Sequence, residues 1–326
     1  MRQQPIELSR RGWIAHLLFG LNGAALLRAA SLNNGTGLTW EAMARAGAGP
    51  ERSTERTYRA DAQILVFGMP FLHRSRVGGG SAIWREAPLP QGGLLRFLEF
   101  NGFSLPERAA GLNRLGFIRE LSRFEPEGAA ESIYFGLMTS SPEESAEEAR
   151  KALESHAREQ AYSVIEGRIA PEGVEATGAH FMAPAQWSVH NREELIKSAR
   201  TALAESPQRP PETSEHSGSL TSFLQALADL LRDPGRSETR YVYGARAYHL
   251  HLARTEDPKA TAAFRERGLI SPNADVIRAT GLLRREGGGK DQNFRVWFEA
   301  GAAMPLPLRI EYQAKSYLRL VFESEG

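Results

Sequence analysis

The sequence predicts a mainly β protein of the α+β class, built on one large antiparallel sheet with a few helices. Three observations support this prediction: runs of β-branched and aromatic residues separated by Gly and Pro, an alternation of apolar and charged residues in the C-terminal third, and only one strongly apolar helical stripe. The chain has 326 residues, of which 41% are hydrophobic and 24% are charged, as in ordinary folded proteins.

The first predicted strands lie at residues 58–67 and 71–86. Gly68 and Pro70 stand between them and indicate a reversal, so the two runs form a hairpin or a sharply bent pair. Gly78-Gly79-Gly80 interrupts the second run, where glycine usually marks a bulge or a bend. Further strands, spaced as in a meander, are predicted at residues 94–100, 115–124, 132–138, 161–168 and 173–181.

The clearest strands lie in the C-terminal third. Residues 276–286 and 292–299 flank Gly287-Gly288-Gly289, which can adopt the positive φ of a tight turn, and residues 304–312 and 317–323 follow. Alternate residues form an apolar face: Phe294, Val296 and Phe298, then Leu306, Leu308, Ile310 and Tyr312, then Leu318, Leu320 and Phe322. The opposite face is predicted to be solvated, with pairs across strands among Arg295, Glu299, Arg309, Glu311, Arg319 and Glu323.

Three helices are expected, at residues 142–158, 192–205 and 220–232. The third has a broad apolar stripe, with Ser219 or Thr221 as a cap and Asp233-Pro234 as a stop. A helix of this kind must bury its stripe, and the sheet is the large apolar partner available to it. Residues 205–219 contain three prolines and indicate a flexible loop.

Residues 1–31 are predicted to be a cleaved export signal. Arg10 and Arg11 precede an apolar run at residues 14–27, which is shorter than the about 20 residues that a membrane-spanning helix needs. The segment resembles a bacterial twin-arginine signal, although Ala15 stands where Lys is frequent and an ordinary buried helix is the alternative. We therefore expect a protein exported to the periplasm or the medium, without a transmembrane segment in its mature chain. Residues 32–326 would form a single sheet domain with a helical and loop insertion at about 140–219.

Charge and cysteine content restrict the partners. The net charge is only +1, which gives no basic field for nucleic acid, so no nucleic-acid partner is expected. Without cysteine the chain forms no disulfide and no thiolate metal site.

No sequence motif indicates catalysis, a metal or a cofactor. His249 and His251 share one strand face, but no third ligand stands at a recognisable spacing, so an exposed strand face explains them better than zinc does. Neither glycine triplet has the strand-to-helix setting of a phosphate-binding loop. A nucleophile elbow and a zinc-protease motif are absent from the sequence, so we assign no catalytic residues, no metal and no cofactor.

The C-terminal part resembles an uncharacterised family of bacterial exported proteins, a domain of unknown function. The resemblance rests on residues 294–299 (FRVWFE), on residues 305–311 (PLPLRIE) and on the helix at 220–232 before them, with a looser likeness at residues 58–84. It implies a strongly curved antiparallel sheet, a half-barrel similar to that of the lipoprotein-carrier proteins, with one helix packed on the concave face. It implies no catalytic residues.

Two function classes follow from this expectation. In the first, the helix and the concave face enclose an apolar cleft for a lipid or acyl chain, bordered by Trp84, Phe223, Leu224, Leu227 and Trp297. In the second, the interior is packed core, and the chain is a structural or assembly protein whose surface meets an envelope protein. A hydrolase with an unrecognised site is a third alternative. A cavity of several hundred Å³ would favour the first class, and a filled interior the second.

Overall fold

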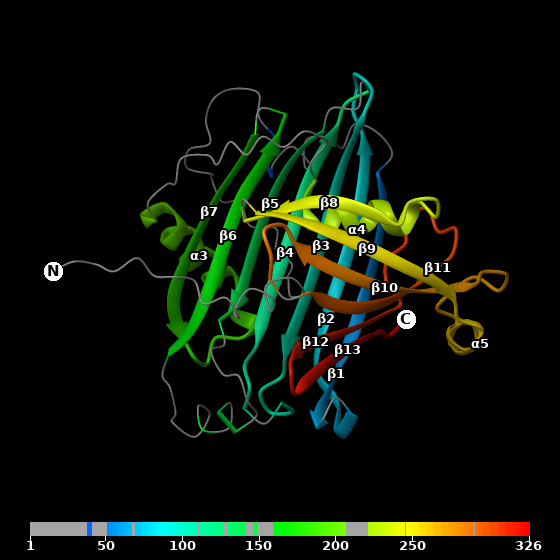
Figure 1. Cartoon of the computed structure of the whole chain (residues 1–326). Helices are drawn as coiled ribbons and strands as arrows, with labels where there is room; N and C mark the ends of the chain where they lie inside the picture. Colours follow the sequence, from blue (N-terminus) through cyan, green and yellow to red (C-terminus); the bar gives the residue numbers. More distant parts are fainter. Residues whose placement is uncertain are drawn as a thin grey trace.

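The structure, a computed structural model, describes residues 38–40, 51–66, 69–109, 111–126, 130–140, 147–148, 151, 159–171, 173–206, 221–244, 246–289 and 291–326. Its main element is a 13-stranded antiparallel open sheet with the order β7-β6-β5-β4-β3-β2-β1-β13-β12-β11-β10-β9-β8 (Figure 1). The strands are β1 (Arg52–Val66), β2 (Met69–Pro88), β3 (Leu94–Ser104), β4 (Leu115–Phe124), β5 (Ala130–Thr139), β6 (Glu159–Ala170), β7 (Gly173–Pro184), β8 (Glu238–Tyr243), β9 (Arg246–Glu256), β10 (Val276–Arg285), β11 (Gln292–Glu299), β12 (Arg309–Lys315) and β13 (Leu318–Ser324). The predicted mainly β, antiparallel class is confirmed.

The first and last strands pair with each other and divide the sheet into two arms. At this seam between β1 and β13, Tyr58 lies opposite Ser324. The N-terminal arm is β1 to β7, and the C-terminal arm is β8 to β13. The arms also touch across the fold: the rings of Tyr134 in β5 and Tyr243 in β8 stack with 5.5 Å between their centroids, and Gly244 N–H donates to Tyr134 Oη. The C-terminal arm therefore crosses over the N-terminal arm, as Figure 1 shows.

Most predicted strands agree with the observed ones. β4 and β11 have the predicted bounds, and the others differ at their ends. The run predicted at 304–312 is an exception, because β12 begins only at Arg309; Pro305 and Pro307 lack the N–H that a strand ladder uses. The sequence pattern did not indicate β8 or the helix α5 (Pro258–Glu266), both of which are short.

The first glycine triplet lies inside β2 and lets β3 approach closely. The register between β1 and β2 shifts just before the triplet, where Arg76 has a φ of 53°, so the predicted bulge is confirmed next to the glycines. A Cβ on Gly78 would stand 1.9 Å from the carbonyl oxygen of Phe103, and one on Gly80 would stand 2.0 Å from that of Asn101. These positions therefore require glycine because of backbone proximity.

Two of the three predicted helices are found as α3 (Arg192–Glu205) and α4 (Phe223–Arg232), with a 3-10 turn η2 (Val189–Asn191) before α3. α3 has the predicted bounds, and α4 stops at Asp233 as predicted. The predicted caps of α4 are corrected, because the residue at its N-cap is Ser222. The predicted helix at 142–158, the loop at 205–219 and the signal at 1–31 lie almost wholly or wholly outside the described residues. The region from about 140 to 219 contains β6, β7, η2 and α3.

The core has one large cluster and smaller ones. The largest joins side chains of both arms with Phe223, Ala226, Leu230 and Leu231 of α4. α3 packs on β6 and β7 and forms a second cluster with them. Within the described ranges, no helix combines the length and the apolar character needed to cross a membrane.

Candidate functional site

Four of the five predicted binding residues meet around one small cavity next to α4. Trp84 projects from β2, and Phe223, Leu224 and Leu227 project from α4. This α4 cavity has a volume of about 60 Å³. The rest of its lining is apolar apart from Glu99: Ala82, Ile83, Leu98, Glu99, Phe100, Ala228, Leu231, Phe294, Val296, Pro305, Leu306, Pro307 and Ile310.

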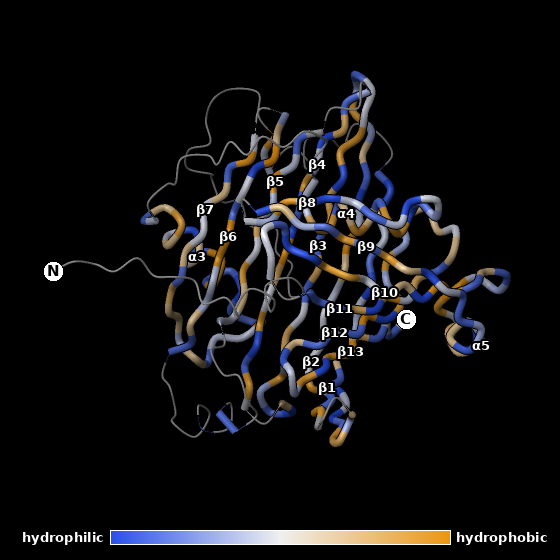
Figure 2. Tube along the Cα trace, viewed as in Figure 1, coloured by the Kyte–Doolittle hydropathy of each residue, from blue (hydrophilic) through white to orange (hydrophobic). Residues whose placement is uncertain are grey.

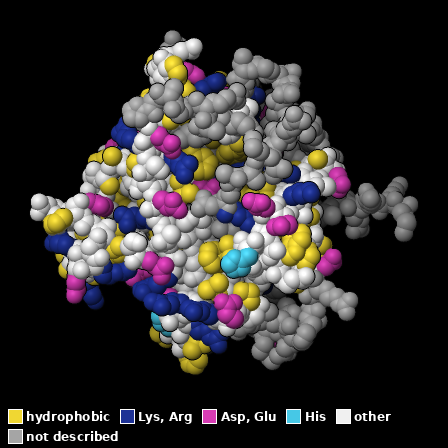
Figure 3. All heavy atoms as spheres, turned by 180° about the vertical axis from the view of Figure 1, so that it is seen from behind, with side chains coloured by type: hydrophobic (Ala, Val, Ile, Leu, Met, Phe, Trp, Pro, Cys, Tyr) yellow, Lys and Arg dark blue, Asp and Glu magenta, His cyan; other side chains and the backbone are white. Residues whose placement is uncertain are grey.

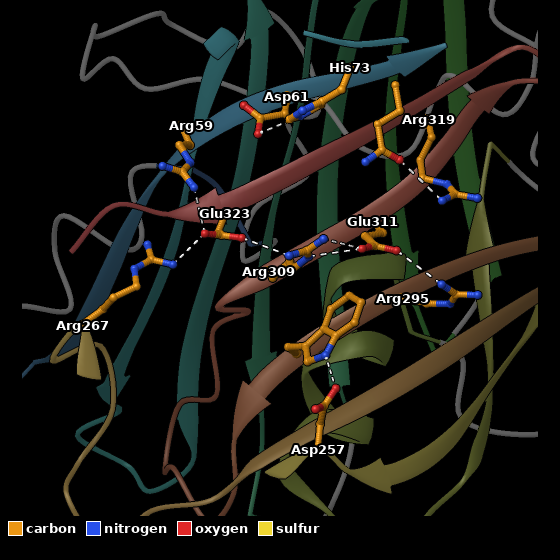
Figure 4. A network of polar contacts seen from close by, with 12 residues as sticks. Arg59, Asp61, His73, Asp257, Arg267, Arg295, Arg309, Glu311, Arg319 and Glu323 are labelled. Carbon is orange, nitrogen blue, oxygen red and sulfur yellow. Dashed lines mark hydrogen bonds and ion pairs between the residues drawn. The ribbon is translucent and has the colours of Figure 1, made fainter. Parts of the chain in front are cut away.

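Trp297, the fifth predicted residue, does not reach the α4 cavity. It stands between Val296 and Phe298, whose side chains belong to the large core, so the alternation of the strand directs it to the opposite face. There it packs with Phe264 of α5, and its Nε1 donates a 2.9 Å hydrogen bond to Asp257 Oδ2 (Figure 4). The expected grouping of Trp297 with the other four is corrected accordingly.

The N-terminus of α4 is held by a buried carboxyl group. Glu120 of β4 is 0% exposed. Its Oε2 accepts hydrogen bonds from Ser222 Oγ at 2.6 Å and from Gln225 N at 2.9 Å, and its Oε1 accepts from Leu224 N at 2.9 Å. Burial raises the pKa of Glu120 to about 7, although these hydrogen bonds lower it. Glu120 therefore satisfies N–H groups that the first turn of a helix leaves unpaired.

The C-terminal half of α4 is held by a second polar cluster. Glu86 of β2 and Arg96 of β3 are 3% and 5% exposed. Glu86 accepts a hydrogen bond from Arg96 Nε at 3.0 Å and another from Arg232 at the end of α4, and Arg96 also pairs with Asp229. Burial alone would raise the pKa of Glu86, but the hydrogen bond and charge of Arg232, with the charge of Arg96, hold that pKa below its ordinary value. Buried polar contacts therefore anchor α4 at both ends.

Sequence reasoning missed Glu120, Glu86 and Arg96. A signal was present, because each takes an inward-facing strand position beside apolar core residues. Glu120 is two residues after Ile118, and Arg96 is two residues before Leu98, and both of these neighbours belong to the large core. A charged residue at such a position departs from the binary pattern of a half-buried strand and indicates a specific buried contact.

The end of the β1–β2 hairpin exposes large apolar side chains. Met69, Phe71 and Leu72 are 68%, 80% and 50% exposed. Arg74 and Arg76 follow in β2 and are exposed as well. These five residues are called the hairpin tip below.

The hairpin tip is a narrow projection. β2 pairs with β3 only from Gly78 onward, so residues 69–74 pair with β1 alone. Figure 2 shows apolar residues at the lower end of this hairpin. In Figure 3, apolar side chains form the lowest point of the molecule, directly below a group of basic ones. The hairpin tip therefore combines three exposed apolar side chains with two exposed arginines, Arg74 and Arg76.

The outer face of the seam carries a charge network (Figure 4). Glu323 of β13 pairs with Arg59, Arg267 and Arg309 at 3.0, 2.6 and 3.1 Å. Arg309 also pairs with Glu311 at 2.6 Å, and Arg295 lies 3.4 Å from Glu311. The predicted cross-strand pairs on this face are confirmed for Arg295, Arg309, Glu311 and Glu323.

The two histidines of β9 do not gather a metal-binding set. His249 lies between Glu238 and Glu286, at 3.1 and 3.0 Å, and His251 is exposed. In the described part of the chain, no group of three or more His, Cys, Asp or Glu side chains is placed to hold a metal ion.

No protein-family model and no curated protein matches this chain. Among solved structures, the chain is similar to the crystal structure of a β-barrel-like protein of domain of unknown function DUF1849 from Brucella abortus. The two chains are 9% identical, the alignment covers 85% of this chain and 95% of that one, and the TM-score is 0.36. At this level the similarity carries no argument for a shared function.

Proposed function

We propose that the chain is an exported, non-enzymatic structural or assembly protein of the bacterial cell envelope, and that it docks on an anionic membrane surface through its hairpin tip. The hairpin tip is the observation that carries the proposal. The twin-arginine-like pair Arg10 and Arg11 supports the compartment.

The interior favours a packed scaffold over a carrier. The α4 cavity of about 60 Å³ is well below the roughly 300 Å³ at which small-molecule sites begin. α4 is the helix expected on the concave face of a half-barrel. Its contacts with Glu120 of β4, Glu86 of β2 and Arg96 of β3 hold it against these strands. Moving it would leave buried charges without partners, which is strongly unfavourable. In this proposal α4 is therefore a permanent part of the core.

The chemistry of the hairpin tip suits a lipid surface. Phe71, Met69 and Leu72 carry large apolar side chains, whose transfer from water to the acyl boundary of a bilayer is favourable. Arg74 and Arg76 stand behind them, where each basic residue contributes about 1 kcal/mol near anionic headgroups. A stable protein interface buries about 1,000 Å² or more in total, and a convex projection two strands wide offers little of such a surface. A membrane therefore fits the tip better than a flat protein partner.

Vesicle co-sedimentation tests the proposal. The wild-type protein should bind phosphatidylglycerol vesicles, more weakly at high salt and more weakly still when the vesicles are phosphatidylcholine. The double variant Phe71→Ser, Leu72→Ser should lose about tenfold or more in partitioning, because two apolar anchors are removed. Arg74→Gln with Arg76→Gln should weaken binding to the anionic vesicles alone.

Met182→Ser is the matched control. Met182 of β7 is 54% exposed and lies outside the hairpin tip, so its replacement removes a comparable exposed apolar group. This variant should bind like the wild type. Wild-type protein that binds neither vesicle, or a Phe71→Ser, Leu72→Ser variant that binds as well as the control, would overturn the proposal.

An apolar-ligand carrier is the second candidate function. Its support is that the α4 cavity is apolar and is bordered by Leu224 and Leu227, the partly exposed apolar residues of α4. An acyl chain would enter only if α4 moved and enlarged the cavity. Native mass spectrometry of the protein from its own host tests this function, because a carrier should retain a lipid and a packed scaffold should have the mass of the protein alone.

A further inference from the structure

Another polar cluster, distinct from those that hold α4, lies on the face of the N-terminal arm that α3 covers. It consists of Glu99 in β3, Arg119 in β4, and Arg192 and Arg200 in α3. Five atoms of these residues are shielded from solvent and have no hydrogen-bond partner among the described residues: Glu99 Oε1, Arg119 Nε, Arg192 Nε and Nη2, and Arg200 Nε. Four of the five are donors. We call these four residues the arginine cluster. It shares no residue with the hairpin tip, and Glu99 is the residue that it shares with the lining of the α4 cavity.

Aromatic rings hold the arginines in place without using their N–H groups. The guanidinium of Arg119 lies 4.7 Å from the ring centroid of Trp40 and 5.5 Å from that of Phe135. The guanidinium of Arg200 lies 5.6 Å from the same Phe135 ring. Such contacts stabilise the cationic face of a guanidinium and leave its edge free to donate.

The unpartnered atoms of the cluster are mostly donors. Burial raises the pKa of Glu99 to about 7, although the charges of Arg119, Arg192 and Arg85 lower it. Burial lowers the pKa of Arg119 to about 10; Glu99 and Glu166 raise it, while Arg200 and Arg192 lower it further. Carboxylates and arginines thus act on one another here, but the unpartnered edge atoms comprise four N–H donors and one acceptor.

Buried donors without partners are rare in native proteins, and each costs about 1–3 kcal/mol unless water or a ligand accepts its hydrogen bond. We propose that Arg119, Arg192 and Arg200 form a binding site for an oxyanion of the phosphate class. Arginine edges match phosphate oxygens and form charge-assisted hydrogen bonds with them. Glu99 Oε1, the acceptor in the cluster, would take a hydrogen bond from a hydroxyl group of the same ligand. A free phosphate and the headgroup of a phospholipid share this chemistry.

Isothermal titration and thermal unfolding with inorganic phosphate test the site, with chloride at equal ionic strength as the reference. Phosphate should bind and raise the unfolding temperature of the wild type. Arg192→Gln and Arg200→Gln should each weaken phosphate binding about tenfold or more, as expected for the loss of charged hydrogen bonds. Arg284→Gln is the matched control: Arg284 is an exposed arginine paired with Asp291 at 2.9 Å, and this variant should bind phosphate like the wild type.

If the variants are unstable, titration of the wild-type protein with phosphate still tests the site. A water-soluble, short-chain phosphatidylglycerol distinguishes the two sources, because a headgroup site should prefer it and a free-phosphate site should prefer inorganic phosphate. Absence of binding of both ligands to the wild type would overturn the proposal. Unchanged binding in folded Arg192→Gln and Arg200→Gln would overturn it as well.

Discussion

Replacing Glu120 by Gln tests whether the buried carboxyl group under α4 is neutral or charged near neutral pH. Glutamine has nearly the shape of the protonated side chain and cannot ionise. In the wild type the pKa of Glu120 is raised from 4.5 to about 7 by burial. The folded protein therefore binds a proton more tightly at this site than the unfolded chain does, and ionisation of Glu120 opposes folding.

The sign and size of the effect follow from this shift. A folded pKa above the unfolded one gives stability that is fully present below pH 4.5 and is lost as the pH rises through about 7. At 1.36 kcal/mol per pKa unit, the change amounts to about 3 kcal/mol. We expect the unfolding free energy of the wild type, relative to Glu120→Gln, to fall by about this amount between pH 4.5 and pH 8.

Urea unfolding of both proteins at four pH values across this range measures the difference. Glu266→Gln, at the exposed end of α5, makes the same chemical change on the surface. It should change the unfolding free energy by only a small amount. A wild-type advantage over Glu120→Gln that grows with pH would refute the reasoning, because it would mean that the helix N-terminus stabilises the carboxylate by more than burial destabilises it.

Three further predictions concern the core, α4 and the N-terminus. Phe298→Ala, at a site 3% exposed, should lower the unfolding free energy by about 3–5 kcal/mol in denaturant titrations. Arg295→Ala, at a side chain 53% exposed, should change it by about 0.5 kcal/mol or less, and a larger loss there would contradict a solvated role. Leu224→Asp should destabilise the fold by at least about 2 kcal/mol, because the new charge lies beside Glu120; an unchanged thermal midpoint would mean that α4 is not core. Arg10→Lys with Arg11→Lys should retain full-length precursor in the cytoplasm of the host, and unchanged export would reject the twin-arginine reading.

Local patterns predicted the elements that local sequence determines. The bounds of α3 and β11 follow from helical and strand periodicity, and the α4 stripe was recognised from its leucines. The position of Trp297 was also contained in the pattern, since Val296 and Phe298 on either side of it already assign the inner face. The parity of Trp297 in the strand therefore decides which face of the sheet it occupies.

The contacts that fix α4 could not be predicted in the same way. Glu120 and Ser222 are 102 residues apart in the chain, and Glu86 and Arg232 are 146 residues apart. Periodicity shows that a charged residue faces inward, but the partner becomes known only when the strands are placed. The arginine cluster has the same origin, because its members come from β3, β4 and α3.

The seam between β1 and β13 has a consequence for synthesis of the protein. The ion pair that crosses it, Arg59 to Glu323, joins residues 264 positions apart. At about 5–20 residues per second, a ribosome needs roughly 10 to 50 s to extend the chain from Arg59 to Glu323 and so complete this pairing. During that interval the nascent N-terminal arm has an open backbone edge at β1, which can pair with another nascent chain. Until β13 is made, the half-finished protein therefore depends on slow encounter rates or on a chaperone to stay monomeric.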